Sequence, residues 1–217
     1  MKRATVFFLI LLAFDASTKA QESNRVTIIY DAFGAPSELE RDWGFSALIE
    51  YGGRRILFDA GNDAKIFQRN VERLGLDLTR LDAAVISHRH GDHTSGLSYL
   101  LEVNPTVKIY TPREGAFFER MARFPEGMLE PYPSLPPEMR YFGGTPPEER
   151  PAAERSYLWD ADFDTVTETT EIFPGFYLIT TRSEKPGTRD MNEVSLVVRT
   201  PLGLAVIVGC SHPGVET

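Results

Sequence analysis

Apolar runs along the chain predict short strands separated by turns and helices. The expected strands before residue 112 are Val26–Tyr30, Phe45–Tyr51, Arg54–Phe58, Leu81–Ser87 and Val107–Tyr110. The pair Gly52-Gly53 is a two-residue hairpin signal between the second and third of these strands. Apolar residues at helical spacing predict helices at Ala64–Leu74, ended by Gly75, and at Thr94–Val103. This alternation of strands and helices predicts a layered α/β domain.

The pattern changes after the fifth expected strand. Nine of the 15 prolines fall between Pro112 and Pro151, among scattered aromatic residues. We expect an insertion over residues 112–160, either a functional lid or a flexible segment. Strand patterns return from Thr165 onward. They comprise a segment at Glu171–Thr180 with a turn at Pro174-Gly175, and a hairpin of Ser195–Arg199 with Leu204–Val208.

The first twenty residues have the layout of a secretory signal peptide. A basic start, Lys2-Arg3, precedes the apolar run Ala4–Phe14, and Thr18-Lys19-Ala20 is an acceptable cleavage site. The alternative is an uncleaved anchor, although the apolar run is short for a bilayer span. We therefore expect a signal peptide over residues 1–20, a domain over 21–217, and a periplasmic or secreted protein without stable membrane insertion after cleavage.

Composition fits a soluble globular protein, since 42% of the 217 residues are hydrophobic and 25% are charged. The net charge of −8 gives no electrostatic reason to bind nucleic acid. A small molecule is the expected partner, and an anionic one is compatible because a bound metal reverses the local potential. The oligomeric state is left open.

The segment from Ser87 to Thr94 holds three of the chain's four histidines. In extended backbone, residues i and i+2 point the same way, so His88 and His90 can reach one metal together. Gly91 allows a sharp turn, after which Asp92 and His93 face the cavity. Imidazole and carboxylate groups without thiolate suit zinc kept for hydrolysis, with iron or manganese as alternatives.

The fourth histidine, His212, also follows an apolar strand. Three nitrogen ligands with an open position for water are typical of a catalytic metal site. His212 is therefore the expected third ligand beside His88 and His90.

The histidine cluster resembles the His-x-His-x-Asp-His signature of the metallo-β-lactamase superfamily, and Phe58-Asp59-Ala60-Gly61 is similar to its Asp-x-Gly motif. Phe45–Glu50, Ile86–Leu97 and Val208–Gly214 resemble the branch related to 7,8-dihydropterin-6-methyl-4-(β-D-ribofuranosyl)aminobenzene-5′-phosphate synthase. The resemblance implies an αββα sandwich with two metals at one edge.

The resemblance also implies roles for individual residues. Asp59 would orient the ligand loop without binding metal, the alternative being a plain turn residue. The first metal would take His88, His90 and His212, and the second would take Asp92 and His93 plus later residues. The superfamily normally supplies another histidine near its C-terminus, which this sequence lacks. We therefore expect a sandwich truncated in its second half, with an incomplete second metal site.

Four further residues are weaker candidates. Cys210 could bind metal as a thiolate, although a small buried residue beside the site is the favoured interpretation. Asp190 and Glu193 could touch substrate or metal, but a solvated loop is favoured for both. Trp43 could line a substrate cleft or belong to the core.

These residues favour a metal-dependent hydrolase that uses a metal-activated water on an ester, thioester, amide or phosphoester, with Asp92 orienting the nucleophile. One alternative is a transferase of the synthase type implied by the resemblance, which the export signal disfavours. Another is a non-catalytic metal-binding fragment. A di-iron oxidoreductase is weaker because such members of the superfamily typically place Glu at the position of His90.

Overall fold

The computed structural model describes residues 24–113, 161–184 and 191–216. The expected signal peptide, nearly all of the expected insertion and Asp190 lie outside these ranges. Within them, no helix is long and apolar enough to cross a membrane.

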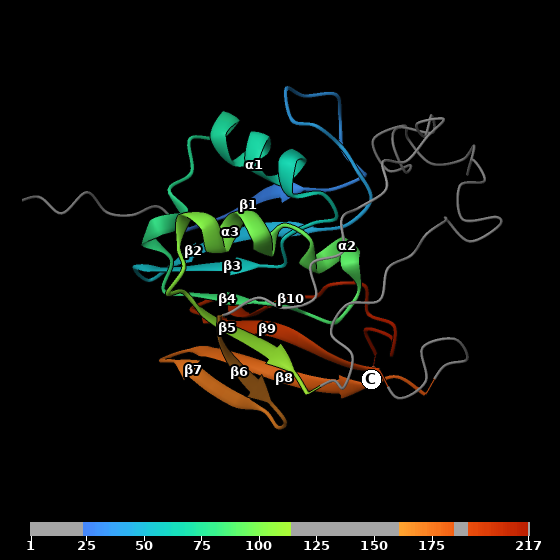
Figure 1. Cartoon of the computed structure of the whole chain (residues 1–217). Coiled ribbons are helices and arrows are strands. Elements are labelled where there is room, and N and C mark those ends of the chain that lie inside the picture. Colours follow the sequence, from blue (N-terminus) through green and yellow to red (C-terminus); the bar gives the residue numbers. More distant parts are fainter. Residues whose placement is uncertain (1–23, 114–160, 185–190, 217) are drawn as a thin grey trace, which may run out of the picture.

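Two sheets and a layer of helices make up the described part (Figure 1). The first sheet has the order β1-β2-β3-β4-β5-β6, and its strands are β1 (Arg25–Tyr30), β2 (Ser46–Tyr51), β3 (Arg54–Phe58), β4 (Ala83–Val85), β5 (Lys108–Pro112) and β6 (Asp162–Val166). The second has the order β10-β9-β8-β7, and its strands are β7 (Thr170–Phe173), β8 (Phe176–Arg182), β9 (Asn192–Thr200) and β10 (Gly203–Ile207). The helical elements are α1 (Ala64–Arg73), the 3-10 turn η1 (Leu78–Arg80), α2 (Gly91–Thr94) and α3 (Leu97–Val103).

Each face of the first sheet buries its own apolar cluster, because successive side chains of a strand point to opposite faces. On one face, Leu48 and Leu57 pack with Phe67 of α1 and Leu100 of α3. On the other face, strand residues pack against the second sheet; this cluster contains Ala47, Ile49, Ile56, Phe58, Val85, Phe176, Leu178, Val194, Leu196 and Val198. The expected α/β sandwich is confirmed, with helices on one side of the first sheet and the second sheet on the other (Figure 1).

The first sheet is antiparallel at one end and parallel at the other. Strands β1, β2 and β3 pair antiparallel, whereas β3, β4, β5 and β6 pair parallel. The carboxyl ends of β3 and β4 therefore meet at one edge of the sheet. Asp59 follows β3 and His88 follows β4, so the two metal-site motifs come from neighbouring strand ends.

Two sequence predictions need correction. The helix expected at Thr94–Val103 begins later, at Leu97, and the short helix α2 ends before it at Thr94. Gly96 lies between the two helices, where a Cβ would lie 2.0 Å from the Ala60 carbonyl oxygen. The strand expected at Leu81–Ser87 is shorter, since the Ser87 amide donates to the Asp59 carboxylate instead of to a neighbouring strand. Strand β6 begins at Asp162, whereas the sequence predicted strand patterns only from Thr165 onward.

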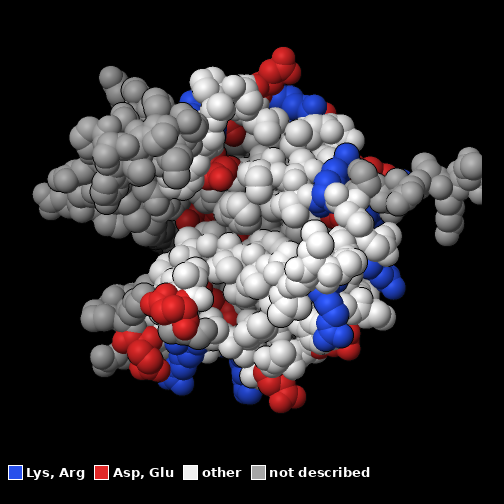
Figure 2. Space-filling model, turned by 180° about the vertical axis from the view of Figure 1, so that it is seen from behind, with Lys and Arg blue, Asp and Glu red and all other residues white. Residues whose placement is uncertain are grey.

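Charges of both signs are interspersed on the face drawn in Figure 2, around a broad area of uncharged side chains. Charged side chains also pair across elements: Glu40 accepts from Arg69 and Arg73, and Asp82 accepts from Arg54. Such exposed pairs each contribute about 0–1 kcal/mol. Stability therefore rests mainly on the two apolar clusters.

A buried tyrosine anchors the loop that follows β3. The Tyr30 hydroxyl donates to Asp42 Oδ2 at 2.5 Å and accepts from the Asp63 amide at 3.0 Å. Asn62 Nδ2 also donates to Asp42 Oδ2 at 2.9 Å. Burial, together with the negative charge of Asp42, raises the pKa of Tyr30 well above its usual value near 10.

The raised pKa of Tyr30 predicts a stability loss at alkaline pH. A pKa that is higher in the folded state stabilises the fold fully below the unfolded value of about 10, and this contribution is lost as pH rises through the folded value. Urea unfolding from pH 8 to 11 should therefore show a steeper decline for the wild type than for Tyr30→Phe, which has no group to ionise. Equal declines in the two proteins would contradict this explanation.

Candidate metal centre

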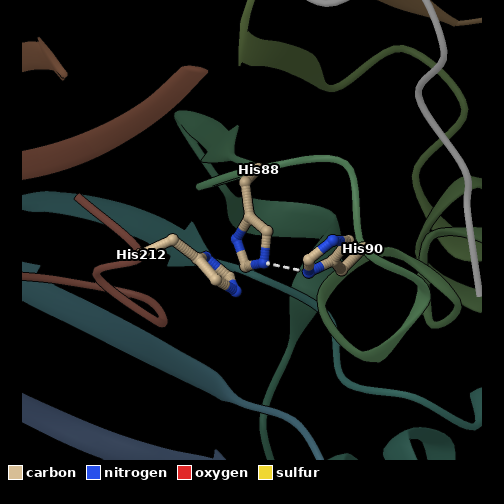
Figure 3. A group of neighbouring side chains, drawn as sticks. All are labelled: His88, His90 and His212. Carbon is tan, nitrogen blue, oxygen red and sulfur yellow. Dashed lines mark hydrogen bonds between the residues drawn. The ribbon is translucent and has the colours of Figure 1, made fainter. Parts of the chain in front are cut away.

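Three imidazole rings converge at the edge where the two sheets meet. His88 and His90 follow β4, and His212 follows β10. Figure 3 shows the three rings turned toward one another. Their centroids lie 4.7 to 4.9 Å apart, and one ligand nitrogen from each lies within 4.8 Å of the others. The structure thus brings together the three residues that the sequence assigns to the first metal.

Hydrogen bonds to the outer sides of the His88 and His212 rings orient them. Ser87 Oγ lies 2.8 Å from His88 Nδ1, so the His88 Nε2 atom is left to face His90 at 3.1 Å. Glu193 Oε1 contacts His212 Nδ1 and also accepts from the His212 amide at 3.2 Å. Such partners fix the tautomer and direction of a metal-binding imidazole.

Asp59 ties the loop after β3 to the histidine segment. Its Oδ1 atom accepts from the Ser87 amide at 2.6 Å, and its Oδ2 atom accepts from Ser87 Oγ at 2.7 Å and lies 2.6 Å from His93 Nδ1. Asp59 has a positive φ of 58°, an uncommon backbone conformation for a residue other than glycine. It belongs to neither group of side chains that could hold a metal, and its orienting role stays a prediction of the resemblance.

Backbone contacts hold the two sheets together at this edge. The Val194 amide of β9 donates to the Ser87 carbonyl at 2.8 Å. A Cβ at Gly209 would lie 2.4 Å from Ser87 Oγ, so only glycine lets the segment after β10 approach this closely. Ser211 then adopts a φ of 53°, which directs His212 back toward His88. Ser87, Gly209 and Ser211 were not identified from sequence, because their role depends on a contact between distant strands.

The pKa values of the histidines in the segment after β4 are shifted in opposite directions. Burial, reinforced by the neighbouring imidazoles, lowers the pKa of His88 well below its usual value. Burial also lowers the pKa of His90. Both rings are therefore neutral at pH 7, which is the form that binds metal. The pKa of His93 is raised instead, because the charges of Cys210, Asp59 and Asp92 outweigh its burial.

The structure places Cys210 and Glu193 differently from the favoured interpretations, and it bears on the two alternatives left open for Trp43. Cys210 is exposed, not buried, and its Sγ lies 3.0 Å from His93 Nε2. Glu193 is 3% exposed on β9, not in a solvated loop, because its carboxylate is used to hold His212. Trp43 is 7% exposed, which favours the core alternative over a cleft wall.

A profile of the metallo-beta-lactamase superfamily matches residues 42–188. The chain belongs to the metallo-β-lactamase superfamily. The expected family and fold are therefore confirmed, and the fold places the histidine cluster within this superfamily's sandwich.

Two archaeal relatives illustrate the similarity. The synthase of 7,8-dihydropterin-6-methyl-4-(β-D-ribofuranosyl)-aminobenzene-5′-phosphate from Methanocaldococcus jannaschii is 26% identical over an alignment that covers 87% of this chain and 68% of the synthase. An uncharacterised protein of the same organism is 48% identical over 79 residues, which cover 36% of this chain and 30% of that protein.

Solved metallo-β-lactamase-fold structures are also similar. A quorum-quenching N-acyl homoserine lactone lactonase has a TM-score of 0.44 at 18% identity, over 75% of this chain and 58% of its own. The MIM-2 metallo-β-lactamase has a TM-score of 0.47 at 20% identity, over 82% of this chain and 59% of its own. The chain thus spans less than two thirds of both structures and of the uncharacterised relative.

Glu193 offers a test of how this metallo-β-lactamase-fold site holds His212. Glu193→Gln removes the negative charge and replaces one acceptor oxygen of the carboxylate with an NH2 group, while it keeps the size of the side chain. We expect metal affinity to fall 10- to 100-fold, as is typical when the partner of a metal-binding imidazole is changed. Competition with a chromogenic chelator measures this affinity. The exposed Glu168→Gln is the matched control, and equal affinities in the two variants would contradict the role of Glu193.

Proposed function

We propose that this protein is a metal-dependent hydrolase that uses water to cleave an ester, thioester, amide or phosphoester bond in a small molecule. The convergence of the His88, His90 and His212 nitrogens within 4.8 Å at one edge of the sandwich carries this proposal. Membership of a superfamily whose members are largely hydrolytic supports it.

The donor set fits a divalent cation. Three imidazoles with an open position for water are the ligands of a catalytic zinc site, and iron or manganese are alternatives. A cation held there would lower the pKa of water and polarise the scissile oxygen. Ser87 and Glu193 hold the rings of His88 and His212 in place, so ligand geometry is set before substrate binds.

Asp92 is the proposed group that orients the attacking water. Its side chain is 4% exposed beside His93, and its Oδ1 atom has no hydrogen-bond partner among the described residues. A buried carboxylate oxygen without a partner is costly, so it is available to accept a proton from water or to meet a cation.

We propose action outside the cytoplasm, on the basis of the N-terminal sequence pattern, and no binding of nucleic acid, on the basis of the negative net charge.

Hydrolysis by metal-free and reconstituted protein tests the proposed function. The purified chain would be freed of metal with a chelator, reloaded with zinc, manganese or iron, and assayed against chromogenic esters, thioesters, lactones, amides and phosphodiesters. We expect turnover of at least one class that disappears on metal removal and returns on reloading. Turnover that is unaffected by complete metal removal would contradict the proposal.

A transferase is the second candidate function. The alignment with the archaeal synthase extends over 87% of this chain, which favours this candidate over other non-hydrolytic ones. Incubation of the zinc-loaded chain with a pterin diphosphate and an aminobenzene riboside phosphate tests it. A condensation product would favour the transferase, and hydrolysis without condensation would exclude it.

A further inference from the structure

Helix α2, which carries Asp92, is too short to hold its own position. It has four residues, and isolated helices shorter than about 12 residues are marginally stable in water. The Asp92 Oδ1 atom has no hydrogen-bond partner among the described residues, so no such bond fixes that oxygen. The direction of the Asp92 carboxylate therefore depends on the contacts that hold the α2 backbone.

The loop after β3 holds α2 from one side through two backbone hydrogen bonds. The Ala60 amide donates to the His93 carbonyl at 2.8 Å, and the Ser95 amide donates to the Gly61 carbonyl at 3.1 Å. The second bond joins the loop to the residue that directly follows α2. Any movement of this loop is therefore passed on to the α2 backbone.

The loop before β2 contacts α2 at Asp92 itself. The Phe45 amide donates to the Asp92 carbonyl at 3.3 Å. A Cβ at Gly44 would lie 2.1 Å from the same carbonyl oxygen, so this close approach requires glycine. The Gly61 amide donates to the Phe45 carbonyl at 3.0 Å, which joins this loop to the loop after β3. The two loops together thus hold the backbone of Asp92.

Three buried polar side chains connect the same two loops behind α2. Asp42, in the loop before β2, accepts through Oδ2 from the Tyr30 hydroxyl at 2.5 Å and from Asn62 Nδ2 at 2.9 Å. Asn62 belongs to the loop after β3, and Tyr30 is the last residue of β1. The Tyr30 ring also packs on Gly61, where a Cβ would lie 2.5 Å from its Cδ2 atom. Asp42 is thus the common acceptor that joins β1 to both loops.

We propose that Asp42 is a positioning residue for hydrolysis, which joins Tyr30 to Asn62 and thereby fixes the two loops that set the direction of the Asp92 carboxylate. The inference rests on the proposed function, because it is there that Asp92 is proposed to orient the attacking water. Asp42 belongs to neither group of side chains that could hold a metal, so it acts on the reaction only through the loops.

Steady-state kinetics at saturating metal test the effect on the reaction. We expect Asp42→Ala to lower kcat by about 100-fold with KM unchanged, the loss typical of a reacting group displaced by about 1 Å. Asp42→Asn keeps an acceptor oxygen for Tyr30 and Asn62, so it should retain nearly the wild-type kcat. Asn104→Ala is the matched control, because the buried Asn104 donates to the Leu78 carbonyl at 2.9 Å and contacts neither loop. It should leave kcat unchanged.

Amide hydrogen exchange of the metal-free protein gives a readout that does not depend on activity. The Ala60 and Ser95 amides make the bonds between α2 and the loop after β3, so they report local opening of this contact. We expect both to exchange about tenfold faster or more in Asp42→Ala, and also in Tyr30→Phe, which keeps the ring and lacks the hydroxyl. The amide of Leu48, in the middle of the first sheet, should exchange at the wild-type rate.

The outcomes separate this proposal from the proposed function. Wild-type kcat in Asp42→Ala would overturn the positioning role, as would an equal loss of kcat in Asn104→Ala or an equal acceleration of exchange at Leu48. If Asp42→Ala does not fold, Tyr30→Phe decides by the same two readouts. Faster exchange at Ala60 and Ser95 in a protein that hydrolyses no substrate class would support the connection between the loops and contradict the proposed function.

Discussion

Replacement of His90 by alanine is expected to lower metal-dependent kcat/KM by more than about 100-fold. Residues that only orient a metal ligand already cost 10- to 100-fold when changed, and His90 is a member of the ligand group itself. The fold should persist, because His90 is half-buried at the end of a loop and contributes to neither apolar cluster.

Lys65→Ala is the matched control for this variant, since Lys65 is exposed on α1 and lies outside both metal groups. Steady-state kinetics on the substrate class found for the wild type, together with metal content by mass spectrometry, give the two readouts. Wild-type turnover in His90→Ala would show that the three-histidine group is not the reacting centre. Equal losses of activity in both variants would indicate inactivation during preparation of the proteins, not the loss of a metal ligand.

Replacement of Asp59 by alanine is expected to lower the free energy of unfolding by about 3–5 kcal/mol, the range seen when one partner of a buried charged network is removed. The Asp59 side chain is fully buried and satisfies the Ser87 amide, the Ser87 hydroxyl and His93 Nδ1. Alanine leaves these groups without their partner and also disfavours the positive φ at this position.

Asp59→Asn is the informative comparison. Asparagine tolerates a positive φ and keeps an acceptor for the Ser87 amide, so we expect a smaller loss of stability than in Asp59→Ala. Urea unfolding of the metal-free proteins measures both differences without a contribution from ligand binding. A loss below about 0.5 kcal/mol in Asp59→Ala, the usual range for surface substitutions, would contradict the network as described.

The strands and the first metal group could be predicted from local sequence. β-branched and apolar runs predicted nearly all strands of the two sheets, since sheet residues must bury one face or both. His88 and His90 are two residues apart after a strand, so their common direction follows from backbone geometry alone. His212 could be predicted as the third ligand, because it is the one histidine outside the segment from Ser87 to Thr94 and a three-nitrogen site needs one further imidazole.

The contacts between the two sheets could not be predicted in this way. Glu193 meets His212, and Cys210 meets His93, only because β9 and β10 bring distant segments to the end of β4. The local sequence around Glu193 and Cys210 does not distinguish them from an ordinary exposed acidic residue and an ordinary buried cysteine. The polar strand β6 was missed for a related reason: its sequence Asp-Phe-Asp-Thr-Val gains its place from parallel pairing with β5.

His88, His90 and His212 are proposed to bind one metal together. Crystals of the chain grown with zinc, measured on both sides of the zinc absorption edge, test it most directly through the anomalous difference density. We expect a strong peak in contact with all three imidazoles. A zinc-loaded crystal with no peak among these rings, or with zinc bound only elsewhere, would contradict it.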